Sequence, residues 1–445
     1  MAASGVACAE PLAQRWRRPR YARPEMGDSL TPEQIVLVIA LVFALAIACQ
    51  VVAPRLHVPG LLLLLPAGFL LGMAFPALNL EDLLGSAFGP AVDLVVAVIL
   101  FQGGLELGRE AGDRRDRMPV MMLVWVGATV TGVVAGVLGA VVLGFPTPIA
   151  ALFGTILVVS GPTVVGPLLD FVRPTPRLRS ILMWEGDLLD PFGALAAVIV
   201  FQMVKASGAE TLWDGIGQFA LGLGVAAGFA IVGALIMRVG LLVSGNSVVL
   251  GTQVLFGAVI VTAGLANTVT DNAGLLAALL MGLIAPRVAR SQNKNIDAAR
   301  PFFDTIVSLA VGVLFVSISA LVPADALGRL ILPVLAVLAV LVLLVRPAMA
   351  FLCTRNAGLS VRERAFIGGV APRGIVAAAT AASVTSTLVA LKVPGAADLL
   401  PATFLVIAGT ALVYGLGAAP LARALKVRQP DSPPDAPAGA SADAV

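Results

Sequence analysis

The stretch WEGDLLDP, Trp184–Pro191, places the carboxylates of Glu185, Asp187 and Asp190 inside one otherwise hydrophobic segment. A charge at the centre of a bilayer costs about 2.5–3.5 kcal/mol on insertion scales, so an acid at such a position is a functional candidate. Shortly before it, SGPTVVGP (Ser160–Pro167) interrupts a second apolar segment with two Gly-Pro pairs. Interrupted helices and buried carboxylates together indicate a membrane protein that handles ions.

The composition supports a membrane protein and excludes several other classes. The chain has 445 residues, of which 59% are hydrophobic and 12% charged, and its mean hydropathy is +0.98. Soluble domains average about 25% charged residues. The basic residues are scattered through short loops, so we expect no nucleic-acid partner. Three cysteines without metal spacing and the single histidine, His57, argue against a zinc centre or a Ser-His-Asp enzyme, and we expect no cofactor.

The apolar segments predict the number of membrane crossings. A crossing helix needs about 20 mostly apolar residues. Thirteen segments meet this need: Ile35–Ala53, Pro59–Phe75, Pro90–Leu107, Val120–Leu143, Pro148–Leu169, Leu178–Val204, Ile216–Met237, Val248–Asn267, Ala273–Pro286, Phe302–Val322, Leu327–Cys353, Arg364–Leu391 and Leu399–Leu425. The sequence therefore predicts an all-α polytopic protein of the lipid bilayer with about 13 transmembrane helices.

The distribution of Lys and Arg predicts the orientation. Most basic loop residues follow odd-numbered spans or lie in the C-terminal tail, which places these loops and the C-terminus in the cytoplasm of an inner-membrane protein and the N-terminus outside. The Arg-rich N-terminal tail, residues 1–32, contradicts this. We hypothesise that the native chain starts at Met26 and that residues 1–25 are not native. The Pro- and Ala-rich tail at 427–445 is expected to be disordered.

Two interrupted spans predict an internal repeat. Gly-Pro pairs break the fifth span, and GGVAPRG (Gly368–Gly374) breaks the twelfth. Interruptions at matching positions of two halves point to a transporter's binding site. The offset of seven spans is odd, so the halves are expected to be inverted in the membrane. Two broken helices that cross at the midplane would present helix ends whose dipoles need compensating charges.

Asp190 is the predicted ion-binding acid. Ser160 and Thr163 in the neighbouring span offer hydroxyl oxygens, and an oxygen cage of this kind suits a hard cation such as Na⁺ or Li⁺. Desolvation disfavours the charged form of a buried carboxylate, so a proton and a cation would compete for Asp190. That competition is sufficient for antiport. Alternatively, Asp190 pairs with a buried arginine and only holds helices together.

A different role is predicted for Glu185. It lies five residues before Asp190, about 140° around the helix, so it faces elsewhere. A salt bridge to Arg346 or Arg373, both inside predicted spans, is its expected role.

Three further polar residues are candidates for an access funnel. Asp187 lies three residues before Asp190 on nearly the same face, and Gln102 and Glu106 lie in the third span. Each could line a path for the ion or lie near the membrane interface, and the sequence leaves both interpretations open.

These features together resemble a known family, the bacterial sodium/proton antiporters of the NhaP kind within the monovalent cation:proton antiporter superfamily. The resemblance covers about Glu33–Lys426. It depends on FQGGLEL (Phe101–Leu107), SGPTVVGPLL (Ser160–Leu169), WEGDLLDP (Trp184–Pro191), GLLAALLMGLI (Gly274–Ile284) and APRGIV (Ala371–Val376).

The resemblance implies how the membrane domain, 33–426, is organised. It implies a six-helix core, about 118–204 and 327–425, built on the two crossed broken helices. It also implies a dimerisation scaffold, about 33–107 and 216–322, and a homodimer. The core would move like an elevator against the scaffold.

The resemblance also implies roles for single residues: Na⁺ bound at Asp190, a bridge from Glu185 to Arg346, and Arg373 steadying the crossed helices. The chain departs from well-studied members in two places. Leu189 precedes Asp190 where they have Asn, and Val164 follows Thr163 where many have Asp. With one titratable acid left at the centre, electroneutral one-for-one exchange is expected.

Exchange of Na⁺ or Li⁺ for H⁺, serving pH homeostasis, is thus the expected function. The alternatives are a K⁺/H⁺ antiporter, a Na⁺-coupled symporter for an organic anion, and a sensor that does not transport. The mainly apolar crossing weighs against the symporter.

Overall fold

The computed structural model describes residues 32–56, 58–75, 88–109, 114–205, 212–245, 247–270, 273–289 and 293–428. Over these ranges the chain is helical, apart from one isolated β-bridge between Pro174 and Arg428. The all-α prediction is confirmed. The first half of the chain contains α1 (Pro32–Val52), α2 (Leu61–Ala74), α4 (Phe88–Arg109), α5 (Arg114–Met122), η3 (Leu123–Gly127), α6 (Ala128–Val141), α7 (Thr147–Ile156), α8 (Pro162–Val172) and α9 (Pro176–Lys205). The second half contains α10 (Leu212–Ser244), α11 (Val248–Val269), α12 (Ala273–Val288), α13 (Asn293–Ala320), α14 (Ala324–Val340), η5 (Leu341–Val345), α15 (Arg346–Cys353), α16 (Val361–Gly368), α17 (Ile375–Ala390), η6 (Ala396–Asp398) and α18 (Leu399–Leu425).

Each of the 13 predicted spans corresponds to helical residues within the described ranges. Eight helical segments there are long and apolar enough to cross a membrane. The shorter apolar helices are α2, α7, α12 and α17. Two of these, α2 and α12, correspond to the second and ninth predicted spans, and the other two are halves of the broken spans. The chain is a multi-pass membrane protein.

The predicted inverted repeat is visible in the helix irregularities. The fifth span breaks between α7 and α8, and the twelfth breaks between α16 and α17. The span before each broken one contains a π-helical turn, η3 in the fourth span and η5 in the eleventh. Such turns are rare in proteins overall, and those that do occur are frequently found at functional sites. Both irregularities therefore recur seven spans apart, as an inverted repeat requires.

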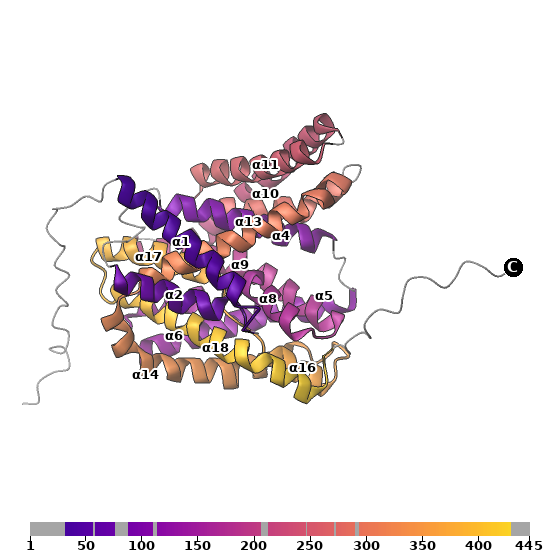
Figure 1. The fold of residues 1–445 in the computed structure, drawn as a ribbon. Helices are drawn as coiled ribbons and strands as arrows, with labels where there is room; N and C mark the ends of the chain where they lie inside the picture. The colour runs from indigo at the N-terminus through magenta and orange to yellow at the C-terminus, as the bar shows by residue number, and fades with distance from the viewer. Residues whose placement is uncertain are drawn as a thin grey trace, which may run out of the picture.

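The buried residues form two clusters. The larger one joins helices from most of the chain, and α4 packs along α12 within it. The smaller one draws only on residues 120–189 and 350–427. In Figure 1, α10 and α11 form one edge of the molecule and α14 lies at the opposite edge, with α9 between them.

The C-terminal boundary lies slightly later than predicted. Val427 and Arg428 were assigned to the tail, yet the Thr175 amide donates to the Val427 carbonyl at 3.0 Å, and Arg428 forms the β-bridge with Pro174. These backbone hydrogen bonds hold Val427 and Arg428 against the membrane domain, although their composition does not distinguish them from the rest of the tail. The predicted start at Met26 and the remainder of the tail lie outside the described residues.

Candidate ion-binding site

The breaks in the two interrupted spans contact each other directly. The Ser160 hydroxyl donates to the Pro372 carbonyl at 3.1 Å, and the Arg373 guanidinium donates to the Val158 carbonyl at 3.2 Å. A Cβ atom added to Gly374 would lie 2.8 Å from the Gly161 nitrogen, so the backbones touch where the spans cross. The two crossed broken helices are therefore a feature of this fold.

Asp190, from α9, places its carboxylate at this crossing. Its exposed fraction is 0%. A Cβ atom on Gly161 would lie 2.5 and 3.0 Å from its two oxygens, and one on Gly374 would lie 3.7 Å from Oδ1. Gly161 and Gly374 are the N-caps of α8 and α17. The carboxylate thus lies at the positive ends of two helix dipoles. Gly161 must lack a side chain because of its contact with Asp190, and Gly374 must lack one because of its contact with the backbone of Gly161.

Neither oxygen of Asp190 has a hydrogen-bond partner among the described residues. The structure brings Ser160 to the same crossing, where its hydroxyl oxygen keeps acceptor capacity while its proton goes to Pro372. Thr163 belongs to α8, but its side chain lies outside the described part of the chain. Asp190 is therefore a buried carboxylate whose oxygens are available to a ligand.

Two arginines lie at the other ends of the broken helices. Arg346 forms a bidentate ion pair with Glu185, with Nη2 to Oε2 at 2.8 Å and Nη1 to Oε1. Arg346 also donates to the carbonyl of Val370 at 3.1 Å, just beyond the C-terminal end of α16. Arg373 makes the equivalent contact with Val158, just beyond the end of α7. Each negative helix end thus receives a cation.

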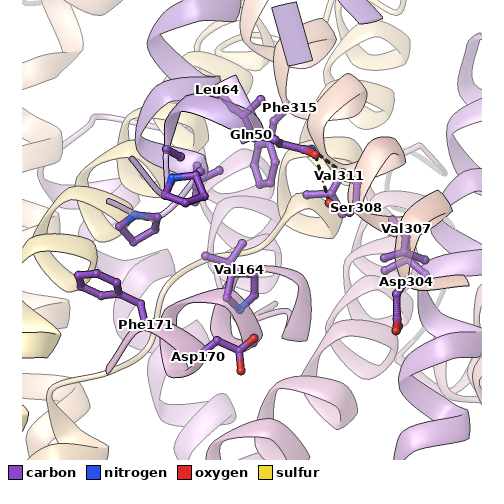
Figure 2. A pocket seen from close by; sticks show the side chains of 18 of the residues that line it. Gln50, Leu64, Val164, Asp170, Phe171, Asp304, Val307, Ser308, Val311 and Phe315 are labelled. Carbon is purple, nitrogen blue, oxygen red and sulfur yellow. Dashed lines mark hydrogen bonds between the residues drawn. The ribbon is translucent and has the colours of Figure 1, made fainter. Parts of the chain in front are cut away.

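A cavity of about 640 Å³ leads from one side of the membrane domain toward the crossing. α1, α2, α4 and α13 border it on one side, and α8 and α9 on the other (Figure 2). Val164 and Gly166 of α8 line the part nearest the crossing. The helix ends that border it adjoin loops after odd-numbered spans, the loops that the sequence predicts to be cytoplasmic.

The structure separates the three predicted funnel residues. Gln102 and Glu106 line the cavity, whereas Asp187 is 2% exposed and does not line it, because the whole turn from Glu185 to Asp190 is packed inside the protein. Asp304 also lines the cavity and was not predicted. The sequence could have indicated Asp304, because it is an acid near the start of the tenth predicted span.

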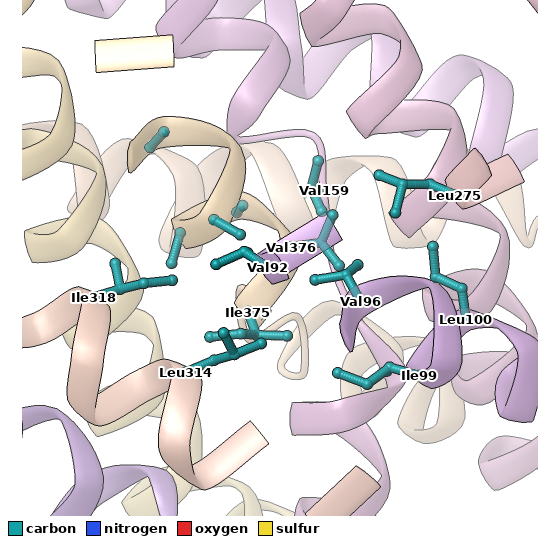
Figure 3. Close-up of a cluster of buried hydrophobic side chains, with 14 of the residues drawn as sticks. Val92, Val96, Ile99, Leu100, Val159, Leu275, Leu314, Ile318, Ile375 and Val376 are labelled. Atoms are coloured by element: carbon teal, nitrogen blue, oxygen red, sulfur yellow. The ribbon is translucent and has the colours of Figure 1, made fainter. Parts of the chain in front are cut away.

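The opposite side of the crossing is closed by apolar side chains. Figure 3 shows Val92 and Val96 of α4 and Leu314 of α13 beside Ile375 and Val376 of α17. All of them are buried. A cavity with polar side chains set in a mostly apolar lining therefore extends toward the site from one side without Asp190 in its wall, and buried hydrocarbon packs on the other side.

A fully buried carboxylate between crossed helix ends, with a cavity that extends toward it from one side, is the arrangement of a secondary transporter for small ions. Comparison with known proteins agrees: residues 37–424 match the family described as sodium/hydrogen exchanger, transmembrane. The chain belongs to that family.

Individual relatives share little sequence identity with this chain, but the similarity extends over most of its length. The chain is 23% identical to Na(+)/H(+) antiporter 1 of Methanocaldococcus jannaschii over 79% of its own length and 82% of the relative's. It is 26% identical to the K(+)/H(+) antiporter NhaP of Alkalimonas amylolytica over 77% of its length, but this covers only 58% of that longer protein. Its fold is similar to the structure of the sodium proton antiporter MjNhaP1 from M. jannaschii at pH 8, with a TM-score of 0.76, 22% identity and coverage of 88% of this chain and 99% of the other.

Proposed function

We propose that this chain exchanges Na⁺, or Li⁺, for H⁺ across the cell membrane by competition of the two ions for Asp190. The observation that carries the proposal is the fully buried carboxylate with no hydrogen-bond partner among the described residues. An isolated ionised carboxylate is very costly to bury. It therefore stays at the crossing either protonated or with a bound cation, and one acid that alternates between these forms gives one-for-one, electroneutral exchange.

The charged groups of Glu185, Arg346 and Arg373 are engaged in other contacts, which favours Asp190 as the residue that binds the ion. Glu185, on the same helix segment, is fully paired, because its bidentate partner Arg346 occupies both of its oxygens. Arg346 and Arg373 direct their guanidinium groups to carbonyls at helix C-terminal ends, away from the carboxylate. Ser160 and Thr163 would complete an oxygen shell around Na⁺ at Asp190.

We propose an elevator-type movement of a core, about 118–204 and 327–425, against a scaffold, about 33–107 and 216–322. The smaller buried cluster supports this division because, apart from Val427, its buried residues all belong to the proposed core. The cavity and the apolar seal support it as well, because both lie where core helices meet scaffold helices. In this state the cavity would open toward the cytoplasm, with the N-terminus outside in an inner membrane, and a homodimer would form through the scaffold.

A K⁺/H⁺ exchanger is the second candidate, favoured by the similarity to the K(+)/H(+) antiporter. Both candidates use the same acid, and the cation that first responds in a transport assay separates them. Membership of the exchanger family weighs against a Na⁺-coupled organic-anion symporter.

Exchange in proteoliposomes tests the proposal. A pH gradient is imposed, and Na⁺, Li⁺ or K⁺ is added to wild type and to Asp190→Asn. We expect cation-dependent collapse of the gradient in wild type, insensitive to membrane voltage, and none in Asp190→Asn. The control Asp325→Asn changes an exposed acid at the first turn of α14 and should exchange normally. Folded wild type without flux for any cation would refute the proposal, and flux in Asp190→Asn would place the proton elsewhere.

A further inference from the structure

The carboxylates that line the cavity differ in how their charges are compensated. Glu106 lies 3.4 Å from Arg300, and Asp170 lies 2.7 Å from Arg179. Asp304, on α13, accepts a hydrogen bond from the Gln102 side chain and has no basic partner among the described residues. Among the described residues that line the cavity, Asp304 is therefore the carboxylate without an ion pair to arginine or lysine, and Arg300, one turn before it on α13, is paired with Glu106 instead.

Gln102 adds a second feature that favours a cation. Its Nε2 donates to Asp304, which fixes the orientation of the amide. Its Oε1 is then buried and has no hydrogen-bond donor among the described residues. A buried acceptor without a donor is unfavourable. An amide oxygen beside a carboxylate is, however, the kind of ligand pair that hard cations take.

The same wall continues deeper with further oxygens. Ser308 lies one turn beyond Asp304 on α13 and donates its hydroxyl to Gln50 Oε1 at 3.1 Å. The Gln50 amide donates in turn to the Ser308 carbonyl at 2.6 Å, as Figure 2 shows. Asp304 and Ser308 are thus each held by a glutamine from another helix, which keeps their oxygens along one side of the cavity.

We propose that Asp304 and Gln102 form a cation-loading site on the scaffold wall of the cavity, distinct from the exchange site at Asp190. This inference rests on the proposed function. Asp304 belongs to α13 in the proposed scaffold, which stays in place while the core moves. The loading site therefore remains on the face where the cavity opens and recruits cations from that face alone.

Asp304 is exposed in the cavity, and a carboxylate without an ion pair in a cleft raises the local cation concentration. Removing it should raise the KM for the cation at the cavity face about three- to tenfold, with unchanged maximal rate. The KM at the opposite face should not change. Because salt screens charges, the effect should be larger at low ionic strength.

The test compares membrane vesicles of the two orientations from cells that lack other antiporters. Everted vesicles present the cytoplasmic face to added Na⁺ and right-side-out vesicles present the external face. We expect Asp304→Asn to raise the KM in everted vesicles only, and Asp304→Glu to restore it. Gln102→Leu keeps the charge but removes the amide oxygen, and it should raise the same KM less. Asp325→Asn, on the opposite face, is the matched control and should resemble wild type.

The outcomes separate this inference from the function on which it rests. Wild type without exchange would overturn the proposed antiport itself. Normal wild-type exchange with an unchanged KM in Asp304→Asn would overturn the loading site alone. A KM raised equally in both orientations would do the same, because it would show that Asp304 acts on the central site.

Discussion

Glu185 and Asp190 lie five residues apart on α9, and both are buried. Arg346 holds both oxygens of Glu185, whereas neither oxygen of Asp190 has a hydrogen-bond partner among the described residues. The partner of Glu185, Arg346, donates to a carbonyl just beyond the C-terminal end of one broken helix, whereas Asp190 lies against the N-caps of two. The comparison shows that burial alone does not define an ion site. Under the proposed function, Asp190 binds the ion because helix ends, rather than a fixed side-chain cation, surround its carboxylate.

The largest expected effect comes from breaking the ion pair between Glu185 and Arg346. Glu185→Gln leaves Arg346 buried without its carboxylate, and breaking a buried ion pair in this way costs about 3–5 kcal/mol. We expect this loss in the free energy of unfolding of detergent-solubilised protein, and a partial recovery when Glu185→Gln is combined with Arg346→Gln.

The control for this prediction is the half-exposed pair of Arg329 and Asp398, which lie 3.3 Å apart. Exposed pairs contribute about 0–1 kcal/mol, so Asp398→Asn should change stability little. Equal losses from Glu185→Gln and Asp398→Asn would show that the Glu185 pair is not special.

The second prediction concerns the unpaired acid. A cation that binds the folded state at 100 times its Kd stabilises that state by about 2.7 kcal/mol. Wild type should gain this stability from saturating Na⁺ relative to choline at equal ionic strength, whereas Asp190→Asn should gain none. Thermal unfolding in the two salts measures it. If Na⁺ stabilised both proteins equally, the cation would bind elsewhere.

Much of this arrangement could be predicted from the sequence. The 13 spans follow from apolar runs, and the breaks in the fifth and twelfth follow from Gly-Pro pairs, because hydropathy and backbone chemistry are local properties. A bridge from Glu185 to an arginine could also be predicted, since a buried charge needs a partner. The choice between Arg346 and Arg373 could not, because it depends on the angle at which two distant spans cross.

Other features depend on packing that no local pattern encodes. The π-helical turns η3 and η5 have ordinary apolar sequences, LVWVG and LVLLV, so nothing in them distinguishes a π-turn from an α-helix. The sequence groups Asp187 with Gln102 and Glu106 because it is polar and lies on nearly the same helix face as Asp190. The structure separates them because the Asp187 side chain is buried, while α4 faces the cavity.

The third prediction sharpens the comparison at the helix ends. In Gly161→Ala the added Cβ would lie 2.5 Å from Asp190 Oδ2, so the carboxylate or the backbone must shift. Overpacking of this kind costs about 1–3 kcal/mol, and we expect exchange to fall at least about tenfold. Gly166→Ala, in the same helix, is the matched control, because its Cβ would meet Met183 at an ordinary 3.8 Å. Similar exchange in the two variants would contradict the close contact with Asp190.

The smallest expected effect concerns the apolar seal. Ile375→Val removes one methyl group beside Leu314 of the scaffold (Figure 3), at a cost of about 0.5–1.5 kcal/mol. If that contact exists only while the cavity is open, the equilibrium shifts away from this state by about two- to twelvefold. The measurement is the rate at which an impermeant thiol reagent labels Val307→Cys, a cavity position, in a background without native cysteines. Labelling should slow in Ile375→Val. Ile367→Val removes the same methyl group within the core cluster, where no scaffold residue contributes, and should leave the rate unchanged. If both variants slowed labelling equally, the effect would come from a loosened core, and the apolar cluster would not hold the two halves of the molecule in this state.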